Sequence, residues 1–187
     1  YCYDCGQGQI SKVVDPQLQY GDQYWFRTST SPTAKAGIDF FHDYFEKQTQ
    51  GRTFQSLVEL GCNDLYLLQK IRHRAKECVG IDTIWTGKEF VDGNLTVRGT
   101  TDDLGKPDLI ISEHTFEHLL DPAETLEHLI TSAADGALFF IEVPSLECLV
   151  QTKRFDQVFH QHLNYFGIHS LQKLIRRLGC RYLSHTY

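Results

Sequence analysis

Short apolar runs alternate with segments of helical spacing along most of this chain. Five apolar runs predict strands, at residues 56–61, 78–82, 95–99, 107–112 and 136–143. Apolar residues at three- and four-residue steps predict helices near 31–48, 63–75, 122–133 and 170–178. This order predicts an α/β, Rossmann-like fold, in which helices cover both faces of an open and mostly parallel sheet.

Local signals set several boundaries of these elements. Ser31 is placed to cap a helix that starts at Pro32, and Asp121 precedes another helix start at Pro122. Ser170 is expected to cap the last helix, whose apolar face carries Leu171, Leu174, Ile175 and Leu178 and which Gly179 ends. Residues 180–185 would then form the next strand.

Composition restricts the function classes. The 187 residues are 41% hydrophobic and 22% charged, which suits a globular chain with its own core. The net charge of −6 comes without a basic stripe, so we expect no nucleic-acid partner. No window of about 18 uncharged apolar residues occurs, so we expect no membrane span. Four cysteines spread singly favour reduced thiols in the cytoplasm.

Cys2 and Cys5 form a CxxC pair near the start of the chain. This spacing fits half of a zinc site, a redox pair, or two thiols in a loose segment. No second CxxC follows, so zinc would need ligands from outside this chain. The chain also lacks Met and starts at Tyr1, so we expect a fragment of a longer protein.

The first strand-to-helix turn, "VELGCNDLYLL" at 58–68, carries the main cofactor signal. Glu59 and Gly61 come at the end of the strand, and the turn offers free backbone N–H groups. Asp82 ends the next strand 21 residues after Gly61, where an acidic residue can bind a ribose diol.

This turn departs from a dinucleotide motif. Asn63 replaces the second glycine and Asp64 follows, so a carboxylate would repel a pyrophosphate. A cofactor with a ribose, a positive centre and no phosphate fits better, and S-adenosylmethionine (SAM) is such a cofactor. A plain structural turn is the alternative.

A second signal is the stretch "FDQVFHQHLNYF" at 155–166, which sets His160 and His162 among aromatic residues after a strand end. Carbon methylation requires removal of a proton next to a ketone, and histidine is the natural base at neutral pH. An aromatic pocket would keep the imidazole neutral. The alternative is a loop in which both histidines only form hydrogen bonds.

These two stretches, together with "PDLIISEHTFEHLLDP" at 107–122, resemble the SAM-dependent C-methyltransferases of deoxysugar-nucleotide biosynthesis, in order and spacing. Tyr3–Ser31 also resembles the family's link between a zinc-binding domain and the methyltransferase core. The similarity covers the chain from about Cys2 to the last helix. It implies a class I, Rossmann-like methyltransferase core acting on a small molecule, a sugar nucleotide.

The resemblance implies roles for individual residues. His162 matches the catalytic base, and His160 and Tyr165 would orient it or bind the sugar. Tyr24, Phe159 and Gln161 are the candidates for substrate contacts. The candidates for cofactor contacts are Glu59, Gly61, Cys62, Asn63, Asp82, Asp102, Ser112, Glu113 and His114.

The resemblance also implies the domain organisation. Residues 1–30 would be the remnant of a zinc-binding domain and linker, and 31–187 the methyltransferase core, with a last strand and a C-terminal domain missing. The family usually has Gly at the position of Leu65, and commonly Tyr and Glu at those of Phe159 and Gln161. These departures predict a crowded cofactor turn and a weaker, altered or lost activity.

Other functions stay open at this point. One alternative is an O- or N-methyltransferase acting on another small molecule, and another is a non-catalytic remnant of the fold. His114-x-x-Glu117-His118 also matches an inverted zinc-protease motif, which would make a zinc hydrolase. A monomer is slightly favoured over an oligomer.

Overall fold

The computed structural model describes residues 1–20 and 24–187, so residues 21–23 of the linking segment lie outside the described residues. The chain divides into two compact units. The sheet unit contains Pro16–Glu113 and Ser132–Glu142. The histidine unit contains Tyr1–Asp15, His114–Thr131 and Val143–Tyr187. The domain boundary at residue 30 stays a prediction.

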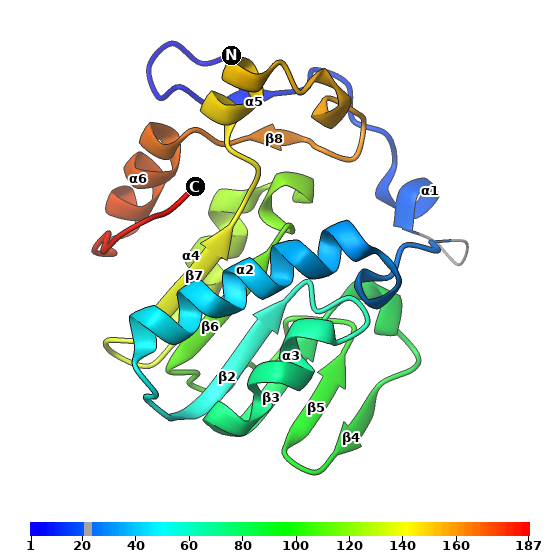
Figure 1. The fold of residues 1–187 in the computed structure, drawn as a ribbon, viewed down its shortest axis with the longest axis vertical. Helices are drawn as coiled ribbons and strands as arrows, with labels where there is room; N and C mark the ends of the chain where they lie inside the picture. Colours follow the sequence, from blue (N-terminus) through cyan, green and yellow to red (C-terminus); the bar gives the residue numbers. More distant parts are fainter. Residues whose placement is uncertain (21–23) are drawn as a thin grey trace. The chain divides into compact units, whose positions relative to one another are not determined.

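The sheet unit is built on a six-stranded sheet with the order β4-β5-β3-β2-β6-β7 (Figure 1). Five strands are parallel, and β4 runs antiparallel to β5 at one edge. The bounds are β2 Phe54–Leu60, β3 Ala75–Ile81, β4 Phe90–Asp92, β5 Leu95–Arg98, β6 Leu109–Glu113 and β7 Leu138–Glu142. The predicted Rossmann-like sheet is confirmed, and all five predicted strands are present.

The order of the strands reverses between β2 and β6. The chain runs from β2 outward through β3 to β5, and then returns to place β6 on the other side of β2. Leu60 at the end of β2 pairs with Ser112 near the end of β6. A crevice at the carboxyl ends of the strands on either side of such a switch point is where open α/β sheets bind ligands.

One helix, α2 (Pro32–Thr49), crosses one face of this sheet (Figure 1). Ser31 Oγ accepts a hydrogen bond from the N–H of Ala34, and Pro32 is the first helical residue, so the predicted start is confirmed. Phe45 on the buried side of the helix packs against Phe140 of β7, with ring centroids 5.2 Å apart. Aromatic burial therefore anchors the helix to the sheet.

The helix after β2 is shorter than predicted. It consists of α3 (Tyr66–Ile71) and the 3-10 turn η2 (Arg72–Arg74). Ala75, predicted on the apolar face of this helix, is instead the first residue of β3. Ala75 would be buried both at the end of a helix and at the start of a strand, so its apolar character alone does not distinguish a helix from a strand. The remaining short elements of this unit are α1 (Pro16–Tyr20), η1 (Thr28–Thr30) and η3 (Thr83–Trp85).

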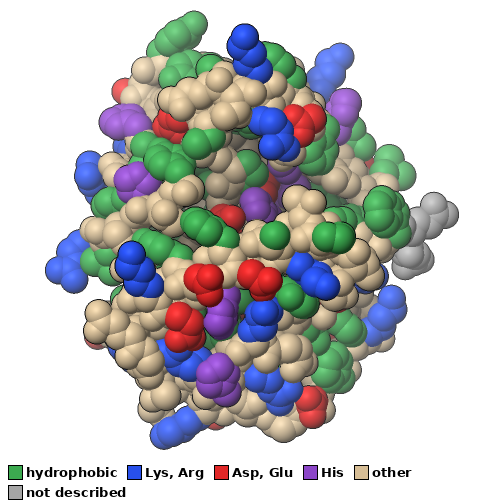
Figure 2. Space-filling view, in the orientation of Figure 1, with side chains coloured by type: hydrophobic (Ala, Val, Ile, Leu, Met, Phe, Trp, Pro, Cys, Tyr) green, Lys and Arg blue, Asp and Glu red, His purple; other side chains and the backbone are tan. Residues whose placement is uncertain are grey.

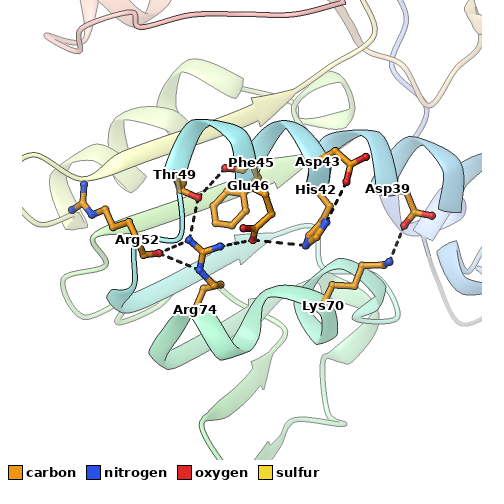
Figure 3. A network of polar contacts seen from close by, with 9 residues as sticks. All are labelled: Asp39, His42, Asp43, Phe45, Glu46, Thr49, Arg52, Lys70 and Arg74. Carbon is orange, nitrogen blue, oxygen red and sulfur yellow. Dashed lines mark hydrogen bonds and ion pairs between the residues drawn. The ribbon is translucent and has the colours of Figure 1, made fainter.

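Arg74 connects η2 to α2 through a polar network (Figure 3). It is 5% exposed, pairs with Glu46, and donates to Thr49 Oγ1 at 3.1 Å and to the backbone oxygen of Arg52. Its guanidinium also lies 5.3 Å from the centroid of the Phe45 ring. On the face seen in Figure 2, acidic and histidine side chains lie together in the middle of the view, with basic side chains beside them. This face carries no stripe of one charge.

The histidine unit has a two-stranded antiparallel sheet of β1 (Gly8–Gln9) and β8 (Asn164–Tyr165). Its helices are α4 (Pro122–Ser132, of which the last residue belongs to the sheet unit), α5 (Leu146–Thr152) and α6 (Ile168–Arg177), and its 3-10 turns are η4 (Phe116–His118) and η5 (Phe155–Gln157). Asp121 Oδ1 accepts from the N–H groups of Ala123 and Glu124, which confirms the predicted start of α4.

Two predictions at the end of the chain are wrong. Gly167, and not Ser170, is the N-cap of α6. Ser170 lies one turn further along, where its hydroxyl accepts from the N–H of Gly167 at 3.0 Å, so the helix starts three residues earlier than expected. Residues 180–185 form no strand, because they pair with no neighbouring strand in the described chain. Among the described residues, no helix combines the length and the apolar character needed to cross a bilayer.

Candidate active site

The turn after β2 is held against β3 by backbone hydrogen bonds. The N–H groups of Gly61 and Cys62 both donate to the carbonyl of Ile81, at 2.7 and 3.1 Å. Gly61 has φ +82°, a conformation that glycine adopts without strain. The predicted use of a glycine at this turn therefore has a backbone reason. The prediction that the turn offers free N–H groups is wrong, because those of Gly61, Cys62, Asn63 and Asp64 all donate to oxygen atoms of the chain itself.

Asp82 links this turn to the end of β3. Its Oδ2 accepts from the N–H of Asn63 at 2.9 Å, and its Oδ1 accepts from the N–H of Ile84 at 3.2 Å. The indole N–H of Trp85 donates to the carbonyl of Asn63 at 2.7 Å. Asn63 and Asp82, 19 residues apart in sequence, thus form one rigid corner at the carboxyl edge of the sheet.

Tyr24 lies within the electrostatic reach of this corner. Burial, and then the negative charge of Asp82, raise the pKa of the Tyr24 hydroxyl. Burial likewise raises the pKa of Asp82, against the hydrogen bonds that it accepts from Ile84 and Asn63. The structure therefore brings Tyr24, a predicted substrate residue, close to the predicted cofactor turn.

Four carboxylates gather at this edge. Glu59 is 3% exposed, and its pKa is raised well above the usual range, first by burial and then by the charges of Glu113, Asp82 and Asp64. The ionised members of this set repel a pyrophosphate and attract a cation. The expected preference for a positively charged cofactor without phosphate agrees with this electrostatic field.

Several buried polar atoms at the same edge have no hydrogen-bond partner in the described structure. They are Glu59 Oε2, Asp64 Oδ1 and Ser112 Oγ. Buried polar groups in proteins are normally paired, so unpaired ones indicate a ligand or ordered water. Carboxylate and hydroxyl oxygens suit the ammonium and ribose hydroxyls of SAM, so the residues present fit this cofactor.

Leu65 packs into the core beside the turn, and crowding of the cofactor by its side chain stays a prediction. Leu65 adopts a left-handed conformation, with φ +69°, and this explains why glycine suits the position. Its side chain is 6% exposed and belongs to the hydrophobic core of the sheet unit, together with Leu68 and Ile71. Leu65 therefore gains burial of its side chain and keeps a backbone conformation that is unfavourable for leucine.

The other predicted cofactor residues have different surroundings. Cys62 is 3% exposed, and burial together with nearby carboxylates strongly raises the pKa of its thiol, so it stays neutral. Ser112 and Glu113 are buried at the end of β6. Asp102 is exposed, and its carboxylate accepts from Thr100 Oγ1 at 2.9 Å. A role in binding adenine stays a prediction for Asp102.

In the histidine unit, His162 is 6% exposed and surrounded by aromatic rings. Its ring centroid lies 4.2 Å from that of Phe159 and 6.3 Å from that of Tyr165. Its Nδ1 lies 3.0 Å from the carbonyl oxygen of Gln157. Burial lowers the pKa of His162, against the attraction of Glu117, so the neutral imidazole is favoured.

A second histidine and a carboxylate adjoin His162. The rings of His118 and His162 have centroids 5.0 Å apart, and His118 Nδ1 lies 2.8 Å from the carbonyl oxygen of Gln161. Glu117 is 1% exposed, and its Oε1 lies 3.3 Å from His114 Nδ1. Burial raises the pKa of Glu117, but the hydrogen bond and charge of His114 and the charge of His118 together lower it below its usual value, which favours the carboxylate form.

The remaining predicted residues of this unit are less enclosed. His160 is exposed, as is Phe159 at 39%, while Gln161 contributes its backbone carbonyl to His118.

Cys2 is exposed, and hydrogen bonds from Cys5 lower the pKa of its thiol. Zinc binding by this pair stays a prediction that needs outside ligands.

The sequence did not indicate that Glu117 and His118 join His162. The residues lie more than 40 positions apart, and His114-x-x-Glu117-His118 pointed instead to a helical zinc motif. That motif is not on an α-helix: η4 is a three-residue 3-10 turn, and His114 has φ +47°. The available signal was that both segments follow strand ends, where parallel sheets collect functional residues.

Comparison with known families agrees with the fold. A family model described as a methyltransferase domain matches residues 30–185. The chain therefore belongs to the methyltransferase-domain family, and its class is that of the Rossmann-like, SAM-dependent methyltransferases.

Among individual proteins, the chain is similar to the C-methyltransferase NovU of Streptomyces niveus. The two are 30% identical over 199 residues, which cover 99% of this chain and 47% of NovU. The chain thus spans about half the length of this curated relative.

Solved structures share the fold. The N-methyltransferase NodS from Bradyrhizobium japonicum WM9, in complex with S-adenosyl-L-homocysteine, has a TM-score of 0.60 at 12% identity, over 86% of this chain and 82% of NodS. The YcgJ protein from Bacillus subtilis has a TM-score of 0.60 at 13% identity, over 75% of this chain and 68% of YcgJ. At these identities the likeness concerns the fold alone.

Proposed function

We propose that this chain transfers a methyl group from SAM to a carbon atom of a keto-sugar nucleotide, with His162 as general base. The similarity to a C-methyltransferase over nearly the whole chain supports carbon as the acceptor atom. The class of the protein supports SAM as the donor. The acceptor class rests on the resemblance of the turn motif and the histidine motif to sugar C-methyltransferases.

The acidic edge of the sheet is the proposed cofactor site. SAM, when bound, supplies an electrophilic methyl group on a sulfonium centre. Asp82 would accept hydrogen bonds from the ribose of SAM, and Glu59 and Ser112 would offer buried oxygens to the other polar groups of the cofactor. The N–H groups of Gly61 and Cys62 are bonded to Ile81, so the lack of a side chain at Gly61 is what would let the cofactor approach the turn closely. Negative charge at this edge favours the cationic donor over phosphate-bearing cofactors.

The observation that carries the base assignment is the hydrogen bond of His162 with Gln157. A backbone carbonyl only accepts, so Nδ1 of His162 carries the hydrogen that it donates. In the neutral ring, Nε2 therefore keeps its lone pair. This nitrogen would take the proton from the carbon next to the substrate ketone. The enolate carbon would then bond to the methyl group that SAM supplies, as the methyl–sulfur bond breaks and S-adenosylhomocysteine leaves.

Aromatic side chains define the environment of this base. Phe159 stacks at a tilt of 38° on the ring of His162, and Tyr165 meets the same ring nearly edge-on. These contacts hold the imidazole in one orientation and exclude water from it. His160 and Gln161, adjacent in the chain, remain candidates for binding the sugar, and Tyr24 for the same role in the sheet unit.

The test compares His162→Asn with His169→Asn, an exposed histidine on α6. Calorimetry measures SAM binding, and a panel of keto-sugar nucleotides with labelled SAM measures methyl transfer. Uptake of solvent deuterium next to the ketone measures proton removal separately. We expect His162→Asn to bind SAM normally and to lose both transfer and exchange by at least about a hundredfold, with His169→Asn unchanged.

Other results would assign a different function. Absence of SAM binding would indicate a non-catalytic remnant of the fold. Transfer to oxygen or nitrogen acceptors, with no deuterium uptake, would favour an O- or N-methyltransferase.

The six cysteines are free, which supports our further proposal of a cytoplasmic, reducing location.

A further inference from the structure

We propose that Glu117, His118 and His162 form a binding site for a divalent transition-metal ion of the zinc type. One ligand atom from each of the three side chains lies within 4.8 Å of the others. Glu117 and His162 are buried, and His118 is 24% exposed through its side chain. The cluster lies entirely within the histidine unit, so its geometry does not depend on the sheet unit.

Both histidines are set in the form that a metal requires. His118 Nδ1 lies 2.8 Å from the carbonyl oxygen of Gln161, and His162 Nδ1 lies 3.0 Å from that of Gln157. Each Nδ1 therefore carries a hydrogen, and each Nε2 presents a lone pair when the ring is neutral. A hydrogen bond from one ring nitrogen to a carbonyl is the usual support of a histidine that binds metal through the other.

Glu117 supplies an independent observation. Its Oε2 is buried and has no hydrogen-bond partner in the described part of the chain. Its Oε1 lies 3.3 Å from His114 Nδ1 and 3.8 Å from His118 Nε2. An unpaired carboxylate oxygen in the interior is costly, and a cation beside it removes that cost. His114 orients the carboxylate from outside the cluster.

Backbone contacts hold the two segments of the cluster together. The N–H of Leu163 donates to the carbonyl of Glu117 at 2.7 Å, and Asn164 Nδ2 donates to the carbonyl of Leu119 at 2.7 Å. A site of two imidazoles and one carboxylate suits Zn²⁺, and Co²⁺ in the same geometry. Tetrahedral zinc holds its ligand atoms about 3.4 Å apart, so the side chains close by about 1 Å on binding.

This binding is separate from methyl transfer. A metal on Nε2 of His162 occupies the lone pair that the proposed base needs, so bound ion and active base exclude one another. The site therefore predicts inhibition by zinc if the chain is the proposed methyltransferase. Metal binding itself needs neither SAM nor an acceptor, and its failure would leave the proposed function untouched.

The test uses the full chain with Cys2 and Cys5 replaced by serine, since thiols also bind these ions. Titration with Co²⁺, followed by its visible absorption, and with Zn²⁺, followed by calorimetry, measures affinity and stoichiometry. We expect one ion per chain, and at least about tenfold weaker binding in Glu117→Gln and in His118→Gln. His169→Gln, an exposed histidine of the same unit, should bind normally.

A second measurement does not depend on the folding of variants. Nitrogen NMR of the imidazole rings should show that Zn²⁺ shifts the Nε2 signals of two of the nine histidines. No binding at about 1 mM ion, a shift in other histidines, or an unchanged affinity in both folded variants would overturn the proposal.

Discussion

The backbone N–H of Asn63 donates to Asp82 Oδ2 at 2.9 Å, and this bond joins the turn after β2 to the end of β3. One carboxylate thus shapes the turn and stands at the carboxyl edge of the sheet, where a ribose would bind. Because it has both roles, its replacement should affect the turn and the cofactor together.

Replacing Asp82 by Asn should weaken SAM binding by about tenfold to a hundredfold, since an amide loses a charged acceptor for the N–H groups of Asn63 or Ile84 and for the ribose. Calorimetry with SAM measures this change. Asp43→Asn on α2, whose side chain is 87% exposed, is the matched control and should bind SAM as the parent does. Equal affinity in all three proteins would refute the placement of the cofactor.

At position 65, we expect the glycine variant to be more stable than the alanine variant, which is the reverse of the usual order of these two residues. Leu65→Ala removes buried side-chain atoms and keeps the left-handed backbone, so we expect a loss of about 2–5 kcal/mol in the free energy of unfolding. Leu65→Gly removes the same atoms but relieves the strain, so it should be more stable than the alanine variant by about 0.5–1 kcal/mol.

Urea denaturation of the two Leu65 variants measures the order. Because the parent side chain packs in the core, SAM affinity in Leu65→Gly should stay within about threefold of the parent, a difference below about 0.7 kcal/mol. A much higher affinity in the glycine variant would show that leucine does obstruct the cofactor turn.

Glu59 should make stability depend on pH. Its pKa in the folded chain is raised above the unfolded value, so between the two values the folded state holds a proton that the unfolded state has released. Stability is therefore lost as pH rises above about 4.5. The slope for one proton is about 1.4 kcal/mol per pH unit.

The comparison of the parent with Glu59→Gln tests this slope. The amide does not ionise, so the variant should lose less stability than the parent when the pH rises from about 5 to about 7. Urea unfolding across that range measures both proteins. Parallel pH profiles would mean that Glu59 is ionised in the folded state.

Arg74 should contribute more to stability than an exposed cation on the same surface. Arg74→Ala removes the pair with Glu46, the bonds to Thr49 and Arg52, and the contact with the Phe45 ring, so we expect a loss of about 2–3 kcal/mol. Lys70→Ala removes a bridge of 2.8 Å to Asp39 in a solvated setting and should have little effect. Thermal unfolding of both variants measures the difference.

Local patterns predicted the architecture well and the ends of elements less well. The strands can be recognised from apolar runs, because a strand that is covered on both faces of the sheet consists almost entirely of apolar residues. The end of α3 was missed because Ala75 is apolar and buried either as the last residue of a helix or as the first of a strand. The absent strand at 180–185 shows that a segment expected to follow the last helix as a strand forms none when no neighbouring strand pairs with it.

At the candidate site, the sequence by itself determined the turn from Glu59 to Asn63, the acidic end of β3 at Asp82, and the histidine stretch around His162, because strand ends and turn residues are local features. Tertiary structure alone decided that Glu117 and His118 adjoin His162, that Leu65 points into the core, and that unpaired oxygens gather at the sheet edge. Those facts depend on contacts between segments distant in the chain, and no local periodicity encodes them.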